Sequence, residues 1–244
     1  MNRLILTAVA AIMILAASCD GIGSGSSSSS SSSGTTSKKR SSEPIEVTIT
    51  GVISHTEYTP GQSATVTFSR FPQSVAEFKQ VREQIGKEPQ GAVALQVMAF
   101  EMFRHDRKIG RECIEMNTVN SGVDAPIRRL GQLFGNDANY ARPYQMAGFL
   151  KGATPENGYS PSKPYTVEMS VKEAYQETGI FQSHVIPLKV NAPGRKNGSI
   201  AVSVLKTHKP DEPSNGTYFI VFGCGDLFFQ VEPISFTATF NGLD

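Results

Sequence analysis

The sequence GAVALQVMAFEMF, residues 91–103, decides the fold of this chain. Only Gln96 and Glu101 interrupt its apolar character, so a helix formed here is apolar on nearly every face. A helix that crosses a bilayer needs about 20 apolar residues, and this segment is shorter. It therefore predicts a helix buried at the centre of a globular domain.

Two more helices are predicted around this segment. Ser74 and Glu77 form a capping-box pattern ahead of an amphipathic helix that ends at Gly86. Asp124, as an N-cap, begins another helix after the central one. The helical part of the chain is therefore expected at about residues 73–151.

Strand patterns lie before and after the helical part. Apolar and polar residues alternate at 47–53 and at 64–68, which indicates an N-terminal hairpin. The same period returns at 165–171, 186–190, 200–204 and 234–240, and apolar runs at 218–222 and 227–229 indicate strands covered on both faces. The pattern predicts an α+β domain at 44–244 with about eight antiparallel strands and a helical insertion after the hairpin. A β-sandwich and a single sheet with helices on one face both remain open.

The first residues form a leader. Residues 1–18 place Arg3 before an apolar run that ends in small residues, the pattern of an export signal. The sequence LAASC at 15–19 resembles the lipobox of bacterial lipoproteins, in which the cysteine receives a diacylglyceryl group and becomes the new N-terminus. We therefore expect Cys19 to be lipidated and to hold the chain to a membrane, because two or three acyl chains give stable anchoring.

This lipobox departs from the usual pattern at one position. The large apolar residue normally stands three places before the cysteine, where this chain has Ala16, with Leu15 one place further out. If the leader is instead cut as an ordinary secretory signal, Cys19 becomes a free thiol on a tail. A permanent transmembrane helix is the weaker alternative because the apolar run stops at Cys19. The sequence leaves open whether the inner or the outer membrane holds the anchor.

Residues 19–43 form a serine-rich tether that is expected to be disordered. A Gly/Ser coil of this length has a mean reach of about 28 Å. The chain has 23 Lys and Arg against 22 Asp and Glu, and loss of Arg3 with the leader leaves 22 of each. A neutral domain lacks the basic excess of a nucleic-acid binder, so nucleic acid is not an expected partner.

Few residues suggest catalysis or metal binding. His105 and Cys113 could form a nucleophile pair only if the chain bends near Gly110, because eight residues of helix separate them by about 12 Å. A charged helix end beside a buried cysteine is the simpler interpretation. Glu101 and His105 fall short of a metal site because further ligands are missing, and no cofactor motif is found. Cys113 and Cys224 could form a disulfide or stay reduced in the core.

The segment 135–164 has the composition of a binding surface. It carries Tyr140, Arg142, Tyr144 and Tyr159 among asparagines and prolines. Tyrosine and arginine offer large contact areas, and long ordered loops often serve a function. The alternative is a crossover that buries these tyrosines against the sheet.

Several stretches of the chain resemble an uncharacterised bacterial family classed only as a domain of unknown function. They are GAVALQ at 91–96, LFGND at 133–137, YARPY at 140–144, LKGATPENGY at 150–159, VLKTHKP at 204–210 and SFTATFNG at 235–242. The resemblance covers roughly residues 75–244 and implies a bacterial source but no chemistry.

The sequence thus predicts an exported, lipid-anchored domain of the bacterial cell envelope. A non-enzymatic binding or interaction role is favoured, with a small molecule, a glycan or an envelope protein as the partner and without a cofactor. The alternative is a tethered hydrolase that uses the region of His105 and Cys113.

Overall fold

The computed structural model describes residues 43–54, 60–172, 176–178 and 183–243. The chain divides into two units, Met1–Lys39 and Arg40–Asp244, and the described residues belong to the second. The expected signal peptide at 1–18, Cys19 and the tether up to residue 42 lie outside the described residues. Within the described part, no helix combines the length and apolar character needed to span a membrane.

The described residues of the second unit form one antiparallel sheet of seven strands. The strands are β1 (Val47–Gly51), β2 (Ser63–Phe68), β3 (Tyr165–Val171), β4 (Gln176–Thr178), β5 (Ser183–Asn191), β6 (Ser199–Leu205) and β7 (Ile220–Gly223). Six of them follow the order β1-β2-β3-β5-β6-β7, and β4 pairs with β5 outside this path. The N-terminal hairpin is confirmed, because β1 and β2 pair in register from Val47 opposite Phe68 to Gly51 opposite Ala64.

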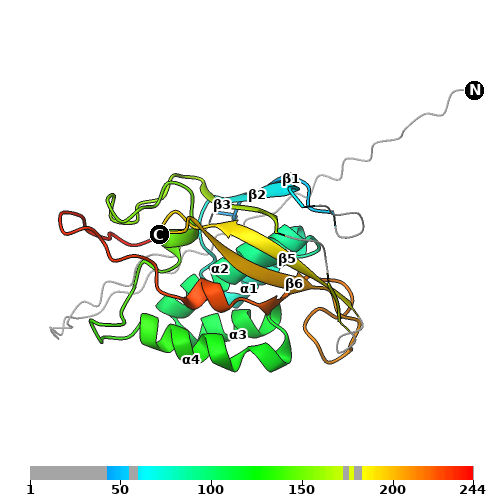
Figure 1. The fold of residues 1–244 in the computed structure, drawn as a ribbon. Helices are drawn as coiled ribbons and strands as arrows, with labels where there is room; N and C mark the ends of the chain where they lie inside the picture. The colour runs from blue at the N-terminus through cyan, green and yellow to red at the C-terminus, as the bar shows by residue number, and fades with distance from the viewer. Residues whose placement is uncertain (1–42, 55–59, 173–175, 179–182, 244) are drawn as a thin grey trace, which may run out of the picture. The chain divides into compact units, whose positions relative to one another are not determined.

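In the part of the chain that the structure describes, four α-helices cover one side of this sheet (Figure 1). They are α1 (Val75–Ile85), α2 (Pro89–His105), α3 (Arg107–Asn117) and α4 (Asp124–Leu133). Every residue of α2 from Pro89 to Phe103 is buried, and α2 contacts β2, β6 and β7 as well as the other three helices. The predicted central helix is therefore confirmed.

The helices approach one another closely at two glycines. A Cβ atom at Gly91 would lie 1.7 Å from the carbonyl oxygen of Ile85 at the end of α1. A Cβ atom at Gly110 of α3 would lie 2.1 Å from the Cα atom of Phe103 in α2. Only glycine allows these backbones to touch, so the tight packing of α1, α2 and α3 depends on both positions.

The α+β class is confirmed, with helices on one face of a single sheet rather than a β-sandwich. Two segments expected to be strands are not. Residues 227–229 belong to a 3₁₀ turn, Gly225–Phe228, and its end, and residues 234–240 have no strand. In the second segment Ile234 and Phe240 pack on the core while the backbone bonds locally, as from Ala238 N to Ser235 O. The alternation there does not mark a strand, and it does not follow burial either, because Phe236 within it is fully exposed.

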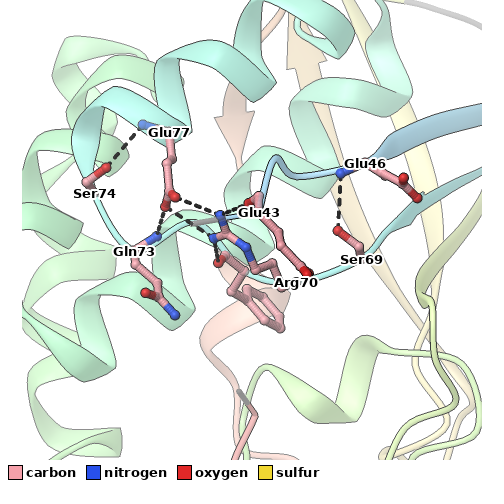
Figure 2. A network of polar contacts seen from close by, with 8 residues as sticks. Glu43, Glu46, Ser69, Arg70, Gln73, Ser74 and Glu77 are labelled. Carbon is pink, nitrogen blue, oxygen red and sulfur yellow. Dashed lines mark hydrogen bonds and ion pairs between the residues drawn. The ribbon is translucent and has the colours of Figure 1, made fainter. Parts of the chain in front are cut away.

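A polar network fixes the start of the folded unit to the first helix (Figure 2). The Ser74 hydroxyl accepts a hydrogen bond from Glu77 N at 3.2 Å and caps α1 as predicted. The Glu77 carboxylate accepts bonds from Arg70 Nη2 at 2.7 Å and from Gln73 N at 2.6 Å. Arg70 also donates to the carbonyl oxygen of Glu43, so one guanidinium joins the beginning of the unit to α1.

Candidate functional site

The face of the sheet that the helices leave open is polar. Along β2, β3 and β6, buried apolar residues point toward the helices, and the less buried residues between them point outward. Pairing places the outward residues side by side, because Thr65 lies opposite Glu168, Ser170 opposite Lys189, and Asn191 opposite Ser199. Most of these side chains are short hydroxyls or amides.

Three shallow depressions join on this outer face, and we call them together the outer trough. They have volumes of about 350, 320 and 620 Å³, and neighbouring depressions share lining residues on β3, β5 and β6. The polar lining residues are Thr50, Ser63, Thr65, Glu168, Ser170, Lys172, Lys189, Asn191, Asn197, Ser199 and Asp226. Because neighbouring strands lie about 4.8 Å apart, the path from β1 to β6 spans about 19 Å.

Glu168 is the carboxylate at the middle of the outer trough. Its Oε1 atom lies 2.8 Å from Lys151 Nζ, and its Oε2 atom accepts a hydrogen bond from Asn191 Nδ2 at 2.9 Å. The bond from Lys151 holds the pKa of Glu168 below its usual value, and the bond from Asn191 acts in the same direction against partial burial. Glu168 is therefore an ionised, already paired group that orients Asn191.

Lys189 and Asp226 line the part of the trough nearest β6. Asp226 Oδ2 accepts a hydrogen bond from Ala201 N at 3.1 Å, which fixes this carboxylate beside β6. The exposed Lys189 side chain forms no ion pair with any residue that the structure describes. It lines two of the three depressions and lies between its pairing partners Ser170 on β3 and Ala201 on β6. An ammonium group in such a place can bind an anion.

The four predicted binding residues do not share one surface. Tyr140 is 49 % exposed, whereas Tyr144 is 8 % and Tyr159 is 0 % exposed. Arg142 is partly buried, and its Nη1 atom donates to the neighbouring carbonyl oxygen of Ala141 at 2.7 Å. The structure therefore buries two of the tyrosines, as the alternative interpretation of the segment 135–164 expected.

The C-terminal tail contacts both the buried tyrosines and the end of α2, where the other candidate residue, His105, lies. The Tyr159 hydroxyl donates to the carbonyl oxygen of Glu232 at 2.6 Å, and burial raises its pKa, with a smaller effect from Tyr144. Phe240 of the tail packs edge-on against Tyr144, with ring centroids 6.0 Å apart. The same ring lies 5.8 Å from the guanidinium of Arg104 near the end of α2. This region is a packed core under the tail.

His105 and Cys113 lack the features of a nucleophile pair. The helix ends at His105, and Asp106 caps α3 by accepting bonds from Lys108 N and Ile109 N. The His105 Nε2 atom lies 3.2 Å from Glu101 Oε1. Cys113 is fully buried, and burial, followed by the charge of Glu112, raises its pKa to about 12. A thiol in this state is not activated for attack.

The two other candidates from the sequence are a disulfide between Cys113 and Cys224 and a metal site at Glu101 and His105. Cys113 and Cys224 are both free and buried, so they form no disulfide. Glu101 shares its Oε1 atom between Arg104 and His105. Across the described ranges, no cluster of three or more histidine, cysteine, aspartate or glutamate residues is placed to hold a metal ion.

Comparison with protein families finds a match over residues 70–235 to a domain of unknown function, DUF6935. The chain belongs to the DUF6935 family. Membership confirms the expectation of an uncharacterised domain, and the matched part of this DUF6935 domain includes all four helices and strands β3 to β7. Comparison with curated proteins and with solved structures finds no match.

The outer trough was not predicted from the sequence. Its signal lies in the polar half of each alternating strand pattern, as in Glu168 and Ser170 of β3, Lys189 of β5 and Ser199 of β6. A half-buried strand shows such polar residues whether its outer face is bare or binds a ligand. Strand order and register are needed to show that the outward residues meet in one hollow.

Proposed function

We propose that this DUF6935 protein is a lipid-anchored protein of the bacterial cell envelope whose domain binds a polar ligand in the outer trough. The anchor is proposed from the lipobox-like residues 15–19, and the binding role from the trough. One observation carries the binding role, namely that hollows lined by hydroxyl, amide and charged groups join across five strands of an open sheet face.

A binding role fits these groups better than catalysis does. The trough carboxylates are already engaged, Glu168 by Lys151 and Asn191 and Asp226 by the backbone of β6. The one candidate nucleophile pair, His105 and Cys113, has a buried thiol with a raised pKa. Groups that are held in place but not activated suit recognition by hydrogen bonds and charge.

Filling the trough tests the binding role. The full chain, expressed with its leader in bacteria and extracted in detergent, is incubated with isolated cell-wall material and sedimented. We expect Ser170→Trp, which places an indole in the trough, to weaken retention at least about tenfold, because a filled hollow excludes the ligand. Gln80→Trp on the exposed side of α1 is the matched control and should bind as the wild type does. Equal retention of the Ser170→Trp variant would exclude the trough.

The anchor is tested separately. Labelling with a fatty-acid analogue in the wild type and in Cys19→Ala, followed by membrane fractionation, should give label and membrane association only in the wild type. Unchanged labelling of Cys19→Ala would exclude lipidation at this residue.

A further inference from the structure

The charges of the outer trough are not balanced in the same way along its length. In the middle of the trough, on β3, Glu168 is neutralised by Lys151, and its second oxygen is engaged by Asn191. At the β6 end, Asp226 is bound to the backbone of Ala201, while Lys189 has no ion pair among the described residues. The ammonium of Lys189 is therefore the group best placed to form an ion pair with a negatively charged group of a ligand.

The polar groups around Lys189 define the rest of the ligand. Lys189 lies opposite Ser170 on β3, and Asn191, two residues further along β5, lies opposite Ser199 on β6. Hydroxyl and amide side chains can both donate and accept hydrogen bonds, so they match a ligand that carries many hydroxyl groups. No described residue that lines the trough is aromatic, so binding there depends on hydrogen bonds and charge rather than on ring stacking.

The shape of the trough favours a chain molecule. The three depressions follow one another across the strands over about 19 Å, which exceeds the length of a single small metabolite. An extended peptide normally binds at a sheet edge, where free backbone groups pair with it, and the face of a sheet offers only side chains. A hydroxyl-rich polymer needs no backbone pairing.

We infer that the ligand of the outer trough is an acidic polysaccharide, a hydroxyl-rich chain with carboxylate groups, and that Lys189 binds one of these carboxylates. Ser170, Asn191 and Ser199 hydrogen-bond the hydroxyls on either side. The inference rests on the proposed binding role of the trough and specifies its ligand class. The Lys189–carboxylate contact is solvent-exposed, so binding weakens as the salt concentration rises.

The test is a titration of the full chain in detergent with three probes of similar length. The probes are oligogalacturonate, its neutral methyl ester and polyglutamate, a carboxylated peptide. We expect oligogalacturonate to bind most tightly and the methyl ester at least about tenfold more weakly, the scale of a hydrogen bond to a charged group. Lys189→Gln should remove this preference, Lys189→Arg should keep it, and Lys79→Gln on the exposed side of α1 should leave it unchanged.

Each other outcome separates the ligand class from the site. Equal binding of the acid and the ester, abolished by Ser170→Trp, would overturn the acidic ligand and keep the trough as the site. Tighter binding of polyglutamate would overturn the saccharide. If oligogalacturonate binds and neither Lys189→Gln nor Ser170→Trp weakens its binding, both the ligand assignment and the proposed site are wrong. If none of the probes binds, the acidic polysaccharide is wrong as the ligand class.

Discussion

The ring of Tyr144 stacks on the ring of Tyr159, with centroids 4.6 Å apart and an angle of 12° between the planes. Both residues come from the segment 135–164, and both hydroxyls bond to the C-terminal part of the chain. Tyr144 accepts a hydrogen bond from Ile234 N, and Tyr159 donates to the carbonyl oxygen of Glu232. The pair therefore fastens a long segment without regular strands or α-helices to the tail that covers it.

Substitution of Tyr159 tests this structural role. We expect Tyr159→Phe to lower the free energy of unfolding by about 1–3 kcal/mol, because the buried carbonyl oxygen of Gly194 and the partly buried one of Glu232 lose their donor. Tyr159→Ala should cost about 3–5 kcal/mol, the usual range for a buried aromatic ring. Urea unfolding measures both, and Tyr140→Ala at the exposed tyrosine should stay within about 0.5 kcal/mol of the wild type. A Tyr159→Ala variant as stable as the wild type would contradict the role.

The network around Arg70 should contribute measurably to stability. Arg70 and Glu77 are 12 % and 24 % exposed, and the guanidinium also bonds the carbonyl oxygens of Glu43 and Phe71. Arg70→Ala removes these charge-assisted bonds and should lower the free energy of unfolding by about 1–3 kcal/mol. The exposed pair Lys87 and Glu83 is the control, and Lys87→Ala should cost no more than about 0.5 kcal/mol. Equal losses in the two variants would contradict the assignment.

The core cysteines should be unreactive in the folded protein. Burial raises the pKa of both Cys113 and Cys224 to about 12, so at pH 8 only about one thiol in ten thousand is ionised. In a Cys19→Ser background, a thiol reagent should label neither residue until urea unfolds the chain, and mass spectrometry locates the labels. Rapid labelling of Cys113 in the native state would reopen the hydrolase alternative.

Glu168 should make stability depend on pH in the acidic range. Its pKa is lowered in the folded state, so its stabilising effect is complete above the ordinary value of 4.5 and is lost as the pH falls through the folded value. Urea unfolding of the wild type and of Glu168→Gln should therefore differ more at pH 7 than at pH 3. A difference that grows toward pH 3 would contradict the sign of this shift.

The sequence was sufficient for elements whose pattern has only one physical explanation. The segment 91–103 is apolar on nearly every helical face, and burial inside the domain is the only stable outcome for it in water. Ser74 and Glu77 specify a helix start through local hydrogen bonds. The C-terminal segment 234–240 was predicted wrongly because alternation alone does not specify strand pairing: Ile234 and Phe240 pack on the core, Phe236 between them is fully exposed, and the backbone there bonds locally.

The candidate site was harder to predict because it depends on contacts between distant segments. Tyr144 and Tyr159 had the composition of a binding surface, yet Phe240 of the tail and the chain around Gly194 cover them. In the sequence, Lys189 looks like any polar residue of a strand, and only the strand register shows that it lies beside Ser170. Both arrangements depend on contacts between segments far apart in the sequence, which the local pattern does not specify.

Hydrogen exchange with and without oligogalacturonate tests the central claim most directly, because it locates the bound ligand on the chain. If the outer trough is the site, the ligand slows exchange in peptides from 165–172 and 185–205 and leaves peptides from 135–147 unchanged. Protection confined to 135–147, around Tyr140 and Arg142, with no change on β3, β5 and β6 would contradict the account.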